Sequence, residues 1–260
     1  MNRSDRTAAL RRQHPKPPLY GKDLRLTREQ AEARRSPNPG PFEEIFFAHH
    51  GRPANKWVHY LPFYDRALAP YRGRPIRMLE IGVMHGGSLE LWRKYFGPEA
   101  TIFGIDINPE CAGRVDAPNQ VRIGSQADPE FLRATVAEMG GLDFVLDDGS
   151  HIASHQRLSF EALWPLLAPG GLYVIEDMHT AYWEQWEGGL RRSGTAVELV
   201  KSLVDDMNGR YFDEDEAWAP YEEIGTVFTA DSIAAIEKAA RHAPAGHVWT
   251  DKPTPASQAG

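Results

Sequence analysis

The chain has 260 residues, of which 42% are hydrophobic and 25% charged, a composition typical of a soluble globular domain. Its net charge of −7 argues against a protein whose main role is to bind nucleic acid, because phosphate contacts need a positive surface. No apolar run approaches the roughly 18 residues that a membrane span needs, and the first residues lack the apolar core of a signal peptide. The single cysteine, Cys111, excludes an internal disulfide and a cysteine-rich zinc site. We therefore expect a cytoplasmic protein with neither nucleic-acid nor membrane partners.

The first residues differ in charge from the rest of the chain. Residues 1–40 hold ten Lys/Arg against four Asp/Glu, a net of +6. We expect residues 1–41 to form a basic, proline-rich arm that is solvated or partly disordered; a nucleic-acid tail and an arm swapped onto a neighbouring subunit are the alternatives. Within it, Thr27 and Gln30 can make the capping box of a short helix. A single domain with a helical N-terminal cap should follow over residues 42–248, and residues 249–260 have the composition of a disordered tail.

Short apolar runs alternate with helical patterns from Arg77 onward. Strands are predicted at residues 77–83, 101–107, 121–125, 142–148 and 172–177, and residues 222–239 are predicted to form a terminal hairpin. Ser88 and Asp128 are placed to cap two of the helices, and the Pro-Gly-Gly run at 169–171 to stop a third. Such strands, separated by helical crossovers, indicate an α/β fold whose parallel sheet is covered on both faces and collects ligands at the carboxyl ends of its strands.

The first three strand ends carry residues suited to a nucleoside. Glu80 ends the first strand ahead of a glycine-rich turn, where Gly82 lets a ligand approach the backbone. Asp106 ends the second strand, where a carboxylate can accept hydrogen bonds from both ribose hydroxyls. Gln126 and Asp128 follow the third, positioned to touch an adenine edge. The spacing is not G-x-G-x-x-G and no Tyr-Lys pair stands out, which argues against a nicotinamide-dependent dehydrogenase.

Four acids follow the next two strands. If these strands are neighbours, Asp147, Asp148, Glu176 and Asp177 meet in one small region. Like charges this close raise one another's pKa unless a cation sits among them, and a hard divalent cation with oxygen ligands is the simplest candidate. The alternative is that one or two of these acids only cap helices or bond backbone amides. His151, three residues past Asp148, can reach the same pocket.

Six stretches of this chain carry a family resemblance: LEIGVMHGGS, GIDINP, GSQADP, LDDGSH, LAPGGLYVIED and the following HTAYW. From about Lys56 to Asp206 they resemble the class I S-adenosylmethionine-dependent methyltransferases, specifically the metal-dependent sugar O-methyltransferases of macrolide biosynthesis. The resemblance implies a Rossmann-like, mostly parallel seven-stranded sheet with helices on both faces and a C-terminal antiparallel hairpin. It also implies S-adenosyl-L-methionine and Mg2+ as cofactors.

The resemblance implies roles for individual residues. Magnesium would be held by Asp148, Glu176 and Asp177, and His151, with Asp148, would be catalytic, the histidine serving as base. Trp57, His59 and Tyr60 match a family segment near the cofactor. The residues expected to bind the cofactor are Glu80, Gly82, Ser88, Asp106, Gln126, Asp128 and Asp147.

Aromatic residues after the second acid pair suggest a substrate surface, because His179, Tyr182, Trp183 and Trp186 can stack on a sugar ring or flat aglycone, or else on the domain's own core. The function expected from the resemblance is methylation of a deoxysugar hydroxyl on a glycosylated natural product, in antibiotic biosynthesis. The alternatives are a hydroxyl of another small molecule or polysaccharide, and a cofactor-binding protein that has lost its chemistry. The partner expected is a small-molecule glycoside, and a homo-oligomer is possible.

Overall fold

The computed structural model describes residues 24–212, 221 and 223–239, and the chain divides into two compact units, with the boundary in the sequence between Arg35 and Ser36. The first unit contains α2 (Arg28–Glu32), which begins with the predicted capping box: Thr27 Oγ1 accepts from the Gln30 amide, and Gln30 Oε1 accepts from the Thr27 amide. The other predictions for residues 1–23 and for the tail at 249–260 concern residues outside those described. Among the helices described, none has the length and hydrophobicity that a membrane span requires.

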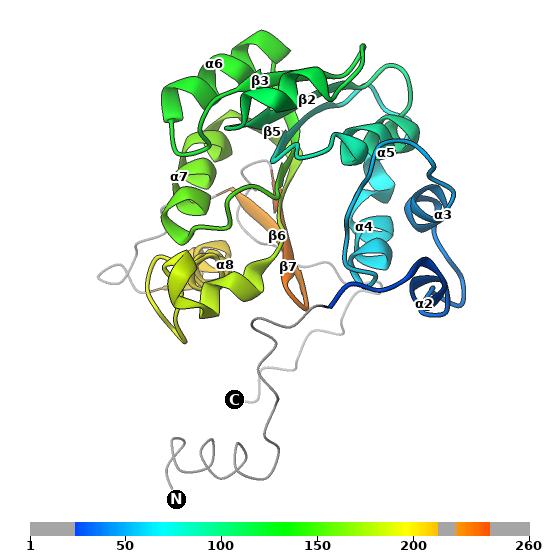
Figure 1. The fold of residues 1–260 in the computed structure, drawn as a ribbon. Coiled ribbons are helices and arrows are strands. Elements are labelled where there is room, and N and C mark those ends of the chain that lie inside the picture. Colours follow the sequence, from blue (N-terminus) through cyan, green and yellow to red (C-terminus); the bar gives the residue numbers. More distant parts are fainter. Residues whose placement is uncertain (1–23, 213–220, 222, 240–260) are drawn as a thin grey trace, which may run out of the picture. The chain divides into compact units, whose positions relative to one another are not determined.

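The second unit is built on one seven-stranded sheet in the order β3-β2-β1-β4-β5-β7-β6 (Figure 1). The first five strands are parallel, and β7 runs antiparallel to both β5 and β6, so the predicted sheet and terminal hairpin are confirmed. The strands are β1 (Arg77–Ile81), β2 (Thr101–Asp106), β3 (Gln120–Ile123), β4 (Leu142–Asp147), β5 (Leu167–Ile175), β6 (Ile224–Ala230) and β7 (Ile233–Lys238).

Helices cover both faces of this sheet, as predicted (Figure 1). One face carries α3 (Pro41–Phe47), α4 (Tyr60–Leu68) and α5 (Gly87–Phe96). The other carries α6 (Pro129–Met139), α7 (Ala153–Leu163) and α8 (Ala196–Met207). Short 3-10 helices fill several connections, at η1 (Ala69–Tyr71), η2 (Pro109–Gly113), η3 (Trp164–Leu166), η4 (Met178–Tyr182), η5 (Glu184–Trp186) and η6 (Gly209–Tyr211).

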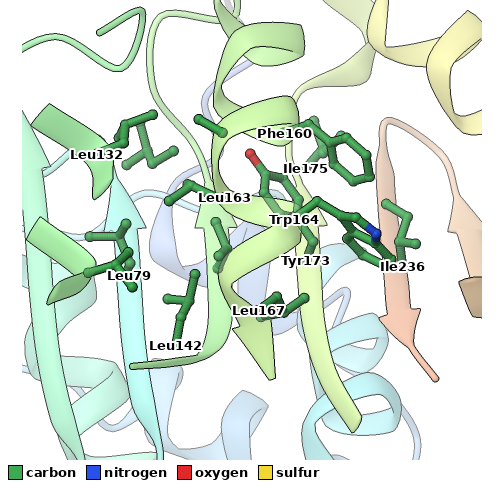
Figure 2. Close-up of a cluster of buried hydrophobic side chains, with 14 of the residues drawn as sticks. Leu79, Leu132, Leu142, Phe160, Leu163, Trp164, Leu167, Tyr173, Ile175 and Ile236 are labelled. Atoms are coloured by element: carbon green, nitrogen blue, oxygen red, sulfur yellow. The ribbon is translucent and has the colours of Figure 1, made fainter. Parts of the chain in front are cut away.

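Each face of the sheet has its own hydrophobic core. Under α6 to α8, Phe160 stacks on Trp164 at 5.1 Å and meets Tyr173 edge-on at 5.0 Å, and Figure 2 shows these rings beside Ile175 of β5 and Ile236 of β7. Under α3 to α5 the core is aromatic, with Phe42 stacked on Trp92 at 4.5 Å. The packing of these buried side chains holds the strands in place and thereby determines where the strand ends lie.

Two local predictions are wrong. Ser88 does not cap α5: the cap is Gly86, whose φ of +81° suits a glycine, and Ser88 lies inside the first turn. The Pro-Gly-Gly run does not stop α7, which ends at Leu163 and continues into η3. It lies instead within β5, where pairing passes from Leu142↔Leu167 to Phe144↔Leu172, so the register with β4 shifts across residues 168–171.

Candidate active site

Three neighbouring strands deliver their ends to one point of the sheet edge. Ile81, Asp147 and Ile175 lie in register across β1, β4 and β5, and the chain leaves the sheet at Gly82, Asp148 and Glu176. The Asp148 amide donates to the Ile81 carbonyl at 3.0 Å. Gly82 has a φ of +94°, and a Cβ there would overlap the Asp148 carbonyl oxygen. Glycine at this position therefore serves the chain's own close backbone packing.

Asp148, His151 and Asp177 converge beyond these strand ends. Each offers one ligand atom, and these atoms all lie within 4.8 Å of one another. The His151 Nε2 atom lies 3.6 Å from Asp177 Oδ2 and 4.0 Å from Asp148 Oδ1. Its Nδ1 atom is buried and has no hydrogen-bond partner among the described residues. Two carboxylates at this spacing can bind a hard divalent cation, and the imidazole beside them can accept a proton.

Glu176, predicted as the third metal ligand, is buried beneath this group beside a lysine. Lys56 Nζ lies 2.8 Å from Glu176 Oε1 and 2.5 Å from Asp148 Oδ2, and Tyr64 donates to the same Glu176 oxygen. The Lys56 side chain is only 1% exposed. Burial opposes its charge, but the two carboxylates outweigh that effect and raise the pKa of Lys56. Lys56 was not predicted as a site residue, and its one signal in the sequence is its place where the family resemblance begins.

Asp177 has a strained backbone conformation, and two aromatic side chains donate hydrogen bonds to its carboxylate. Trp57 Nε1 and the Tyr60 hydroxyl each lie 2.9 Å from its Oδ1 atom, and its amide donates to the Tyr60 oxygen at 3.1 Å. Asp177 has a φ of +53° and His151 a φ of +58°, a region that residues with a Cβ avoid. Strain of this kind persists only where surrounding contacts enforce it, and it gathers at functional sites.

The β6–β7 turn closes the same corner of the site. Its Ser232 Oγ lies 2.5 Å from His179 Nδ1, and the Ser232 carbonyl accepts from the Met178 amide at 2.9 Å. The neighbouring Asp231 carbonyl lies 2.9 Å from His59 Nε2. Of the segment expected near the cofactor, Trp57 and Tyr60 thus reach Asp177, whereas His59 meets this turn.

The predicted cofactor residues around β1 form a buried group. Glu80 is fully buried and accepts from Ser88 Oγ at 2.8 Å and Trp92 Nε1 at 3.4 Å. Burial raises the pKa of Glu80 to about 7, although Lys56 nearby opposes the shift. In the glycine turn, a Cβ at Gly87 would overlap the carbonyls of residues 52 and 53. At Gly87 the turn is therefore packed against the chain's own backbone.

Asp106 lies at the open end of β2. Its carboxylate accepts from the amides of Val83, Met84 and Asn108 at 2.8 to 3.1 Å. Partial burial opposes its charge, but these hydrogen bonds prevail and lower the pKa of Asp106. Two apolar side chains flank it in the open, Met84 at 64% and Ile107 at 75% exposure. An ionised carboxylate between exposed apolar groups fits a ribose with an attached flat base.

The other predicted cofactor contacts have partners inside the protein. Gln126 is buried and bonds Asp147 and Ser159 through Nε2 and the Ser150 amide through Oε1. Asp147 is fully buried, and burial raises its pKa to about 6. Asp128 caps α6 through the amides of residues 130 and 131, as predicted for the helix. The structure gives no support for a ligand contact by Asp147.

The aromatic residues after Asp177 form a row of rings beside the acids. The His179 ring lies 5.7 Å from Trp57 and 4.8 Å from Trp183, and Trp183 lies 5.5 Å from Trp186. Tyr182, next to them in sequence, is 49% exposed. The row borders the acids, since Trp57 bonds Asp177 and His179 Nδ1 lies 4.0 Å from the same carboxylate.

The sheet order and the site at its carboxyl edge define a class I, Rossmann-like methyltransferase fold. A family model described as a methyltransferase domain matches residues 79–178. The solved structure of the MycE methyltransferase from the mycinamycin pathway, in complex with Mg and SAH, aligns with 84% of this chain and 58% of its own at a TM-score of 0.71 and 34% identity. The chain therefore carries a class I methyltransferase domain, and it resembles the antibiotic sugar O-methyltransferases.

Curated relatives agree with this placement. The mycinamicin VI 2''-O-methyltransferase of Micromonospora griseorubida is 42% identical over 196 residues, which cover 69% of this chain and 48% of the relative. The 8-demethyl-8-(2-methoxy-alpha-L-rhamnosyl)-tetracenomycin-C 3'-O-methyltransferase of Streptomyces olivaceus is 36% identical over 208 residues, covering 76% and 51%. The chain spans about half the length of these curated relatives.

Proposed function

We propose that this chain is a magnesium-dependent O-methyltransferase that transfers the methyl group of S-adenosyl-L-methionine to a deoxysugar hydroxyl of a glycosylated natural product. The observation that carries the proposal is the convergence of Asp148, His151 and Asp177 at the carboxyl edge of a methyltransferase sheet. The similarity to enzymes named for the methylation of antibiotic sugars supports the acceptor class.

The residues present fit both cofactors. Carboxylate oxygens of Asp148 and Asp177 offer the hard ligands that magnesium prefers, with Glu176 beneath them, and Asp106 offers an ionised acceptor for a ribose. Magnesium would supply positive charge that lowers the pKa of an acceptor hydroxyl. His151 Nε2 would take the hydroxyl proton, and bound S-adenosyl-L-methionine would supply the methyl group to the acceptor oxygen as its carbon–sulfur bond breaks, leaving S-adenosylhomocysteine.

The test is methyl transfer by the purified full chain. With S-adenosyl-L-methionine and Mg2+, we expect methylation of a deoxysugar glycoside, loss of activity in excess EDTA and recovery when Mg2+ is restored. Matched aglycones, catechols and polysaccharides serve as the comparison acceptors, and mass spectrometry locates the methyl group. Full activity in EDTA would contradict the role of the metal, whereas preference for an aglycone would overturn the acceptor class.

Replacing His151 separates its chemistry from its strain. We expect His151→Ala and His151→Gly both to reduce methyl transfer about 10²- to 10⁴-fold, because both lack the proton acceptor. His151→Gly should be the more stable of the two by about 1–2 kcal/mol, since only glycine adopts a φ of +58° without a Cβ penalty. Urea unfolding measures the difference, and equal stabilities would show that the strain is absent.

A further inference from the structure

We propose that the segment from Lys56 to Tyr64 orients the acids of the cation site, with Trp57 and Tyr60 as positioning residues that leave Asp177 Oδ2 directed at the cation. The inference rests on the proposed function, because it concerns the magnesium site assigned there. It adds residues from a segment more than a hundred positions away from Asp177 in the chain.

The start of α4 is suited to this task. Tyr60 and Tyr64 are four residues apart, so their side chains lie on the same face of the helix. Their hydroxyls reach two consecutive acids, Tyr60 to Asp177 and Tyr64 to Glu176. Lys56, just ahead of the helix, forms ion pairs with one oxygen of Glu176 and one oxygen of Asp148. Each of the three predicted metal ligands therefore has one oxygen engaged by this segment.

The two oxygens of Asp177 have different surroundings. Oδ1 receives Trp57 Nε1 and the Tyr60 hydroxyl, both at 2.9 Å, whereas Oδ2 faces His151 Nε2 at 3.6 Å. Two donors on one oxygen fix the plane of the carboxylate, so the other oxygen is presented in a set direction. On the Asp148 side, Lys56 holds Oδ2 and Oδ1 faces the same imidazole. Hydrogen bonds of this kind to ligating carboxylates tune metal affinity.

Tyr60 holds the backbone of Asp177 as well as its side chain. Its oxygen accepts the Asp177 amide at 3.1 Å, and its single proton lies between Asp177 Oδ1 and the Ser232 carbonyl, each at 2.9 Å. The charged acceptor makes the stronger bond. Loss of this hydroxyl removes the hydrogen bond of the Asp177 amide, which helps to keep Asp177 at a φ of +53°. Loss of Trp57 Nε1 removes a contact to the carboxylate alone.

The experiment is a Mn2+ titration of the full chain, followed by electron paramagnetic resonance, with S-adenosylhomocysteine affinity measured in parallel. The variants are Trp57→Phe, Tyr60→Phe and the double variant. Tyr71→Phe is the matched control, because it removes a tyrosine hydroxyl bond to the Gly170 carbonyl at the amino end of β5.

We expect Tyr60→Phe to weaken Mn2+ binding about 10-fold, Trp57→Phe somewhat less and the double variant up to about 100-fold. The Mn2+ affinity of Tyr71→Phe should change less than about 2-fold, and so should the S-adenosylhomocysteine affinity of every variant.

The outcomes separate this inference from the proposed function. If wild-type protein binds Mn2+ and the Trp57 and Tyr60 variants bind it equally well, the positioning role is overturned while the metal site stands. If wild-type protein binds no Mn2+, the metal site fails and the inference fails with it. A purely structural role would lower the unfolding temperature of Tyr60→Phe without altering the Mn2+ affinity or the spectrum of its bound ion, and would also overturn the inference.

Discussion

Substitution of Asp148 by asparagine is expected to reduce methyl transfer by about 10³-fold, which corresponds to about 4 kcal/mol of lost transition-state stabilisation. Asparagine keeps the size of the side chain but removes the charge that a hard cation needs from its ligand. The fold should persist, because Lys56 retains its ion pair with Glu176 at 2.8 Å. The measurement is turnover at saturating Mg2+, with circular dichroism and S-adenosylhomocysteine binding to establish that the protein is folded.

The matched control is Asp143→Asn, at the opposite end of the same strand. The Asp143 and Asp148 side chains are each 23% exposed and each pairs with a cation, Arg77 in the case of Asp143. We expect Asp143→Asn to keep turnover within a few-fold of wild type, since β4 places it at the amino edge of the sheet, away from the site. If Asp148→Asn retained a tenth or more of wild-type turnover, its assignment as a metal ligand would be wrong.

Lys56→Met is expected to destabilise the protein by about 3–5 kcal/mol, because it leaves Glu176 and Asp148 without their buried cation. That loss is a large part of the stability of an ordinary domain, about 5–15 kcal/mol. Urea unfolding followed by tryptophan fluorescence measures it. The control is Lys201→Met, whose 57%-exposed side chain pairs with Glu198 on the surface and should contribute less than about 1 kcal/mol.

A second substitution tests the cause of this effect. Adding Glu176→Gln to Lys56→Met removes one of the carboxylates left unpaired, and we expect the double variant to recover part of the lost stability. Additive losses would instead indicate that Lys56 acts through packing of its side chain. A Lys56→Met protein within 1 kcal/mol of wild type would contradict the role of the ion pair altogether.

The sheet was predictable because its strands are short apolar runs, and burial between two helical layers leaves little choice of conformation for such runs. The positions of Asp148 and Asp177 follow from that sheet, since the carboxyl ends of parallel strands share one edge. The donors to these acids were not predictable in the same way. Lys56 and Asp148 are 92 residues apart, and Trp57 and Asp177 are 120 apart, so their contact depends on how α4 packs on the folded sheet.

The glycines and the polar residues after β3 show a second limit. Gly82 was expected to admit a ligand, but the structure places the Asp148 carbonyl where its Cβ would be. Gln126 was expected to touch adenine, but its amide is committed to Asp147, Ser159 and the Ser150 amide. In both cases the residue type indicates a close or polar contact, and only the three-dimensional arrangement determines whether the partner is a ligand or the chain itself.

The contacts of the β6–β7 turn have a consequence for biosynthesis of the protein. Ser232 and Asp231 supply partners to His59, Tyr60 and His179, and β7 is inserted between β5 and β6. A nascent chain that has been translated only as far as α8 therefore contains Asp148, Glu176 and Asp177. It still lacks β7, the strand that flanks β5, and the β6–β7 turn that contacts the site. Because Tyr60 and Ser232 are 172 positions apart, this corner of the site depends on a long-range contact that can form only after the hairpin has been translated.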